Sequence, residues 1–213
     1  HRAALAGARI NLVFGASGSL VRQIRDGAPF ELLLAADEES VQQLTSGGLT
    51  RDSGVVYARG RLVLFAPTGS PLEVDARLDG LARALDRRDG ARFAIANPAT
   101  APYGRAAEAV LKRRGLWDRI QSQLVLGETA AQAAQFAVTG NAMGGLIAQS
   151  LAVSPGLAGR GAFVVIPEDG HPPIRQRMVL LTRAGPTAAQ FYRYVQEPAA
   201  KALLRRHGFE VPQ

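Results

Sequence analysis

Short apolar runs alternate with helical segments along most of this chain. Because consecutive strands and helices of this kind pack as strand–helix–strand units, the alternation predicts an α/β architecture with mostly parallel sheets. In such sheets, ligands are expected at the carboxyl ends of the strands. The predicted strands are 9–14, 31–35, 60–67, 92–96, 123–126, 144–148, 162–166 and 178–182, and the predicted helices are 20–24, 38–47, 103–114, 130–138 and, interrupted by Pro198, 187–207.

Two turn-rich segments could carry the chain from one sheet to another. Pro67 to Pro71 is a cluster of helix and strand breakers, and residues 167–173 form a second loop of the same character. The sequence therefore predicts two α/β lobes that face each other across a cleft. Residues 1–66 and 174–213 would form one lobe, and residues 67–173 the other.

Composition narrows the classes of function. The 213 residues are 47% hydrophobic and contain no cysteine, which indicates a packed globular protein and excludes thiolate catalysis, disulfides and Cys-ligated metals. The formal net charge is +7, but the basic residues are spread along the chain rather than gathered with aromatics, so we expect no nucleic-acid partner. A positive field would still attract an anionic ligand. No apolar run approaches the roughly 18 residues needed to span a membrane.

Three loops share one physical property: each brings small or neutral residues to the start of a helix directly after a strand. They are residues 15–19, 100–104 and 127–131. The free N–H groups and the positive dipole end of such helices bind anions without a cationic side chain. Ser17 adds a hydroxyl, which either caps its own helix or donates to a ligand, and the sequence leaves both interpretations open.

Other polar residues give weaker indications of chemistry. His171 has no partner at ligand spacing and is expected in a surface loop, Glu168-Asp169 is expected to be a turn pair, and Asp37 is expected to cap the helix that follows it. The loop Gly15-x-Ser17-Gly18 lacks the Lys of a Walker loop and the third Gly of a Rossmann loop. No general base or carboxylate pair stands beside the anion loops, so we expect no enzyme.

Several stretches resemble the molybdate-binding proteins of ABC importers. The first is FGASGSLVRQIRDGAPFELLLAAD (14–37), which has that family's Ser-rich turn, its L-x-x-Q-I-x-x-G-A-P pattern and its strand ending in A-D. NPATAPYGRAAEAVLKRRGLWDRI (97–120), LVLGETAAQAAQFAVTGNAMGG (124–145) and FYRYVQEPAAKALLRRHGFEVP (191–212) match the same family in order and spacing. The resemblance covers nearly the whole chain.

The resemblance implies an α/β protein of the type II periplasmic-binding fold, with two lobes joined by two crossovers and the ligand in the cleft between them. It implies molybdate or tungstate as the ligand, held through its oxygens by the Ser17 hydroxyl and the backbone amides of Tyr103 and Ala130, with no direct metal ligand and no cofactor. Because the Tyr103 side chain is not the donor, Tyr103→Ala is expected to be milder than Tyr103→Pro. A periplasmic location, a monomeric state and a membrane permease as partner are implied as well.

An oxyanion-sensing regulatory or signalling module of the same fold is the alternative, and it would need an output domain.

The family begins with a strand and a loop that supplies a first hydroxyl ligand, and we expect that unit and the leader peptide to lie outside the printed residues. Ala148 stands where some members place a Tyr hydroxyl.

A site made of donors favours a fully deprotonated dianion over protonated phosphate, and only Glu128 is acidic in the three loops. Molybdate and tungstate are too alike to be separated in this way.

Overall fold

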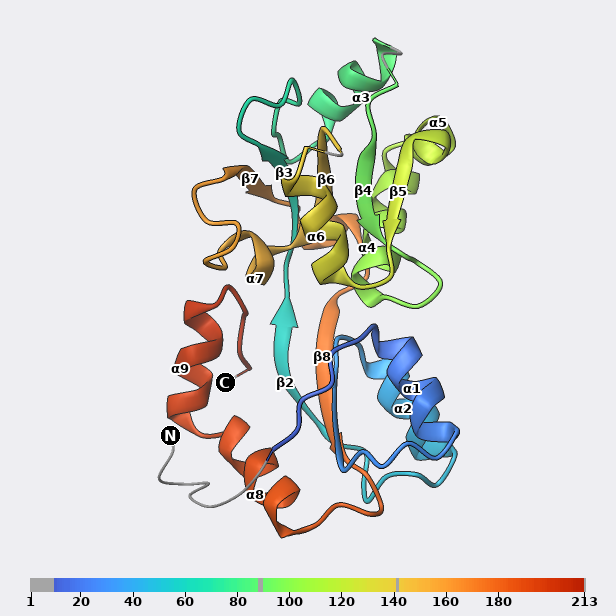
Figure 1. The fold of residues 1–213 in the computed structure, drawn as a ribbon, viewed down its shortest axis with the longest axis vertical. Coiled ribbons are helices and arrows are strands. Elements are labelled where there is room, and N and C mark those ends of the chain that lie inside the picture. Colours follow the sequence, from blue (N-terminus) through green and yellow to red (C-terminus); the bar gives the residue numbers. More distant parts are fainter. Residues whose placement is uncertain (1–9, 88–89, 141, 213) are drawn as a thin grey trace.

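The computed structural model describes residues 10–87, 90–140 and 142–212. The protein is elongated, with a three-stranded sheet at one end and a five-stranded sheet at the other (Figure 1). The first sheet has the order β1 (Leu32–Ala35), β8 (Ile174–Leu180), β2 (Val55–Gly60). The second has the order β5 (Leu124–Gly127), β4 (Phe93–Ala96), β6 (Gly144–Ala148), β3 (Leu62–Pro67), β7 (Gly161–Val165).

Helices cover both sheets. The three-stranded sheet packs against α1 and α2. The helices α8 and α9 come after its strand β8 in the chain (Figure 1). The five-stranded sheet has a hydrophobic core on each face. The helices α3, α4 and α5 pack on one face, and α6 and α7 pack on the other. The helices are α1 (Ser17–Arg25), α2 (Glu38–Ser46), α3 (Asp79–Asp86), α4 (Pro102–Arg113), α5 (Trp117–Ile120), α6 (Ala130–Val138), α7 (Gln149–Ala152), α8 (Pro186–Val195) and α9 (Pro198–Arg206).

The chain passes between the sheets earlier than the sequence predicted. β2 ends at Gly60 and β3 begins at Leu62, where it pairs with β6 and β7 of the five-stranded sheet. Residues 62–66, expected with the first lobe, therefore belong to the second sheet. An extended strand can run directly from one sheet into the next, so the crossover needs no breaker, and Pro67 to Pro71 instead forms the loop after β3. The chain returns between β7 and β8.

The prediction of mostly parallel sheets is wrong for the three-stranded sheet. β1 and β2 both pair with β8 in antiparallel fashion, because β8 returns from the far sheet and enters between them from the opposite end. In the five-stranded sheet β4 is parallel to β5 and β6, whereas β3 is antiparallel to β6 and β7. The β4–β5 pair matters for the site, because the helices that follow these strands begin at the same edge.

The strand predicted at 9–14 is absent from the described part of this segment, since residues 10–16 are irregular and Arg9 lies outside the described residues. Leu12, Val13 and Phe14 are between 55% and 88% exposed. An apolar β-branched run becomes a strand only where a neighbouring strand completes its hydrogen-bond ladder. β2, α3 and the short helices α5 and α7 were not anticipated.

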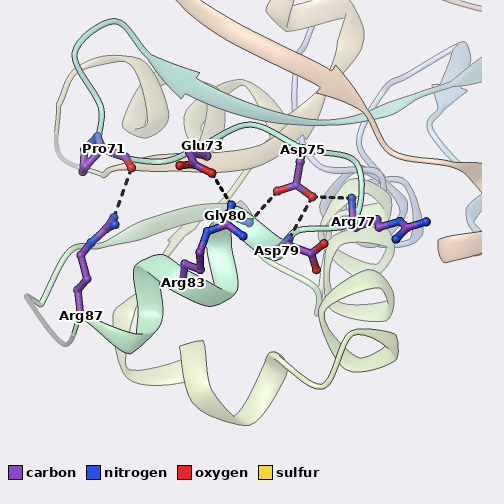
Figure 2. Close-up of polar contacts among 8 residues, drawn as sticks. All are labelled: Pro71, Glu73, Asp75, Arg77, Asp79, Gly80, Arg83 and Arg87. Carbon is purple, nitrogen blue, oxygen red and sulfur yellow. Dashed lines mark hydrogen bonds and ion pairs between the residues drawn. The ribbon is translucent and has the colours of Figure 1, made fainter.

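Asp75 anchors the start of α3. Its carboxylate accepts hydrogen bonds from the backbone N–H groups of Arg77 (2.9 Å), Asp79 (3.1 Å) and Gly80 (2.7 Å), as Figure 2 shows. These bonds hold a turn in which Leu78 takes a left-handed backbone angle of φ 61° and buries its side chain completely. An ion pair between Arg83 and Glu73 ties the preceding loop to the helix (Figure 2).

We expect Asp75 to make the protein sensitive to acid. Burial alone would raise the pKa of this carboxyl, but the three N–H donors and the charge of Arg83 outweigh it, and the pKa lies below its usual value. The carboxylate therefore stabilises the fold above the unfolded-state pKa of about 3.9, and this contribution is lost as the pH falls through the lower folded-state pKa. Asp75→Asn should lower the free energy of unfolding at neutral pH by about 1 kcal/mol, the usual effect of losing a cap.

Urea unfolding between about pH 6 and pH 3 measures this effect. The wild-type protein should lose stability more steeply toward acid than Asp75→Asn. Equal slopes for the two proteins would contradict the role of the carboxylate. Asp86→Asn, at the other end of the same helix, is the control because its removal leaves the three donors of the turn in place.

Candidate oxyanion site

Three helix starts meet in the structure. Ala16 precedes α1, Ala101 precedes α4, and Ala133 lies in the first turn of α6, and these residues form one buried cluster with Ala96 at the end of β4. The small side chains let the three helix ends approach closely. Since β4 and β5 are parallel, with Ala96 opposite Gly127, the helices α4 and α6 that follow them begin side by side. The structure thus brings together the three loops selected from the sequence.

Ser17 is the first residue of α1 and is only 5% exposed. Ala16, not Ser17, occupies the capping position, and no side chain caps this helix, so the capping interpretation of Ser17 is wrong. The Ser17 Oγ instead accepts a hydrogen bond from the backbone N–H of Ala36 at 3.0 Å. A hydroxyl that accepts one hydrogen bond still has its own proton to donate.

Tyr103 and Ala130 occupy the first turns of α4 and α6. Pro102 and Ala130 are the first helical residues, and Thr129 caps α6 by accepting from the N–H of Gln132 at 3.1 Å. The first N–H groups of a helix have no partner within it. Among the described residues, no hydrogen bond joins the N–H of Tyr103 or of Ala130 to an acceptor, whereas the N–H groups of Gly104 and Arg105 both bond to the Ala101 carbonyl.

The Tyr103 side chain lies outside this donor set. It is buried, and its hydroxyl accepts a hydrogen bond from Nε2 of Gln176 at 3.1 Å. Burial, followed by the nearby Tyr57, raises the pKa of the Tyr103 phenol well above its ordinary value, and the bond from Gln176 offsets only part of that rise. The phenol is therefore neutral at physiological pH. Because it is buried and bonded, Tyr103→Ala would open a cavity, so the comparison of its binding with that of Tyr103→Pro requires that the stability of both variants be measured.

Contacts also join the helices of one sheet to those of the other. The N–H of Gly18 on α1 donates to the Thr100 carbonyl, which precedes α4, at 3.1 Å. Asp37 caps α2 by accepting from the N–H of Ser40 at 3.1 Å, which confirms its expected role, and its other carboxylate oxygen pairs with Arg105 of α4. Asp37 and Arg105 are 68 positions apart, so no local pattern could have indicated this ion pair.

A positively charged cavity of about 290 Å³ adjoins the helix starts. Arg22 and Arg25 of α1 and Arg105 of α4 line it, together with Glu39, Gly18 and Thr100. Ser17, Tyr103 and Ala130 do not line this cavity, so it lies beside the donor set. Its charge gives the region a positive potential that attracts anions.

The other polar residues considered from the sequence lie in loops and turns. His171, expected in a surface loop, is 6% exposed, with Nδ1 2.8 Å from the Pro172 carbonyl oxygen, because its loop packs against α4. Glu168 and Asp169 lie in a short 3-10 turn, and Ala148 is buried at the end of β6. Within the described ranges, no three His, Asp or Glu side chains are grouped so as to hold a metal ion. Nor does any helix in those ranges have the length and apolar character required to cross a bilayer.

Comparison with known proteins identifies the family. Residues 3–210 match the model of the family described as bacterial extracellular solute-binding protein. The chain is 37% identical over 206 residues to the molybdate-binding protein ModA of Azotobacter vinelandii, covering 95% of this chain and 79% of that protein. It is 36% identical to ModA of Rhodobacter capsulatus, again over 206 residues, with coverage of 95% and 78%.

A solved structure of the Azotobacter vinelandii periplasmic molybdate-binding protein superposes with a TM-score of 0.86 at 28% identity. The superposition covers 98% of this chain and 90% of that one. Together with the two sheets joined by two crossovers, it confirms the predicted type II periplasmic-binding fold. The family is one of solute-binding proteins rather than of enzymes. The chain belongs to the family of bacterial extracellular solute-binding proteins.

Proposed function

We propose that this protein captures molybdate or tungstate and delivers it to the membrane permease of an ABC importer. The observation that carries the proposal is the meeting of three helix starts around one buried alanine cluster, where the Ser17 hydroxyl and the N–H groups of Tyr103 and Ala130 are free to donate. Donors of this kind bind a fully deprotonated dianion through its oxygens and need no cationic side chain. The ligand's metal would have no direct protein ligand.

The named functions of the relatives support the same ligand. Both bacterial relatives are described as molybdate-binding, and the superposed protein is described as periplasmic. We extend the periplasmic location to this chain. A monomeric state and the absence of a nucleic-acid partner are carried into the proposal from the sequence. The sensing module considered from the sequence is not favoured by these relatives.

Closure of two lobes over the anion is part of the proposal. One lobe comprises residues 10–60 and 174–212 and the other the described residues 62–87, 90–140 and 142–165, with β2–β3 and β7–β8 as the connections. The contacts of Gly18 with Thr100 and of Asp37 with Arg105 would form on closure and slow the release of the ligand.

Calorimetric titration of the purified protein with molybdate, tungstate, sulfate and phosphate tests the proposal. We expect tight binding of molybdate and tungstate and weak binding of phosphate, which keeps a proton. Sulfate is also a fully deprotonated dianion, so its affinity measures how much the size of the anion contributes to selectivity. Mass spectrometry of the anion retained on purification provides an independent identification. Binding of phosphate in preference to molybdate would contradict a site composed of donors.

Arg105 should affect the release of the ligand more than its capture. Because Arg105 pairs with Asp37 of the other lobe, Arg105→Gln is expected to raise the molybdate Kd by about two- to fivefold, the effect of losing a partly exposed ion pair, mainly through faster dissociation. Stopped-flow fluorescence measures both rate constants. Arg113→Gln removes the same charge from the far end of α4 and is the control for long-range attraction. A slower association with unchanged dissociation in Arg105→Gln would show that the ion pair does not hold the lobes together.

A further inference from the structure

A largely buried chain of hydrogen bonds links the strands that join the two sheets to the first turn of α4. The Tyr57 hydroxyl on β2 donates to Oε1 of Gln176 on β8 at 2.8 Å. Nε2 of the same Gln176 donates to the Tyr103 hydroxyl at 3.1 Å. Gln176 is 4% exposed, so the two polar atoms of its amide meet one phenol each in a nearly dry environment. This group is called the Tyr57–Gln176–Tyr103 network below.

A β-bulge brings Tyr57 into the network. Val56 lies opposite Arg177 and Ala58 lies opposite Gln176, so the register of β2 against β8 shifts at Tyr57, which is the additional residue. Bulges of this type redirect a side chain that a regular ladder would place elsewhere. Because of the bulge, Tyr57 and Ala58 together lie opposite the single residue Gln176.

Gly60 provides the space for Tyr103. A Cβ added to Gly60 at the end of β2 would overlap the Tyr103 hydroxyl and come too close to Nε2 of Gln176. The phenol therefore lies directly against the backbone at the crossover. Burial raises the pKa of Tyr57, as it does that of Tyr103, so both phenols stay protonated at physiological pH and the Tyr57 O–H is available to donate to Gln176.

We propose that Gln176 is a positioning residue for oxyanion binding: it holds the Tyr103 phenol against the crossover strands and thereby fixes the direction of the Tyr103 backbone N–H. The side chain and the donor belong to one residue at the start of α4, so restraining the phenol restrains the rotation of the first turn. Tyr57 and Gln176 lie on the two strands that connect the sheets. Movement of one lobe against the other is thus transmitted directly to a ligand donor. This inference rests on the proposed function.

Two substitutions of Gln176 test the role. Gln176→Leu removes both hydrogen bonds at similar volume and should raise the molybdate Kd by about tenfold, within the range seen for residues that act through a network. Gln176→Glu is nearly isosteric. In its protonated form it can accept from Tyr57 and donate to Tyr103, as Gln176 does. The ionised form can only accept, so the Tyr103 hydroxyl would have to turn and donate its own proton, and a charge would lie within the buried network.

The pH profile of Gln176→Glu gives the readout that a purely structural role would not produce. Burial raises the pKa of a carboxyl, so this variant should bind nearly as tightly as the wild type at about pH 5.5 and about tenfold more weakly at about pH 8.5. The wild type should bind equally at both pH values. Circular dichroism identifies a temperature at which each variant is folded under both conditions, and calorimetry then gives the Kd.

Leu85→Ala is the control for general destabilisation. Leu85 is a buried residue of α3 outside the network, so its truncation should lower the free energy of unfolding and leave the molybdate Kd unchanged. A wild-type protein that fails to bind molybdate would overturn the proposed function, and the positioning role with it. A wild type that binds, together with pH-independent, wild-type affinity in Gln176→Glu, would overturn the positioning role alone, whether or not Gln176→Leu folds.

Discussion

Ala130→Pro is expected to weaken molybdate binding by about 10- to 150-fold, which corresponds to losing a hydrogen bond to a charged group worth about 1.5–3 kcal/mol. Proline lacks the N–H that Ala130 would donate, and the first position of a helix is where proline is best tolerated. Thr129 already has the extended backbone, with φ −129° and ψ 161°, that a residue before proline requires. The substitution should therefore remove the donor and leave α6 intact.

Calorimetry and thermal unfolding together measure this effect. The unfolding temperature should stay close to that of the wild type, since three other helices of this chain, α4, α8 and α9, already begin with proline. Ala130→Ser retains the N–H and is the matched control, with binding expected to remain near wild-type strength. Undiminished binding by a folded Ala130→Pro protein would remove Ala130 from the donor set.

Ser17→Ala is the second change with a large expected effect, and it should weaken both binding and the fold. Loss of the hydroxyl removes one donor to the anion, for an expected increase in Kd of about 10- to 150-fold. It also leaves the Ala36 N–H without its acceptor, and because this bond is partly buried the expected loss of stability is about 1 kcal/mol, the lower end of the cost of an unpaired buried donor.

Urea unfolding and calorimetry separate the two consequences of Ser17→Ala. Ser40→Ala is the control, because Ser40 is a serine of similar burial in the first turn of the neighbouring helix α2, where Asp37 provides the cap. Ser40→Ala should leave the Kd within about twofold of the wild type, as expected for a residue outside the donor set. A loss of stability in Ser17→Ala without any loss of affinity would make Ser17 a purely structural residue.

Most strands and helices of this protein could be predicted because their signals are local. The helix at 130–138 was predicted at its observed bounds, and α4 differs from its prediction by one residue at each end. The helix starts followed from small residues placed directly after apolar strands, as at Gly127 and Ala130. Free N–H groups are a property of any helix start, so the loops 100–104 and 127–131 could be selected without a structure, and the resemblance to the family pointed to Tyr103 and Ala130 within them.

The path of the chain between the sheets could not be predicted in the same way. Leu62 continues the extended run of β2, and nothing at that point indicates that its partners lie in another sheet. The antiparallel direction of β8 depends on its return from the far sheet, and the irregular form of residues 10–14 depends on the lack of a pairing strand in the described structure. Strand pairing is decided by partners distant in sequence.

The sequence by itself determined the α/β class, the family and the three helix starts, because each depends on residues close together in the chain. Tertiary structure decided what the side chains at those starts do. Ser17 meets the backbone of Ala36, Arg105 meets Asp37, and the Tyr103 phenol meets Gln176, which is 73 positions away. A backbone donor is set by local helix geometry, whereas a buried polar side chain must find its partner wherever the fold brings one within hydrogen-bond distance.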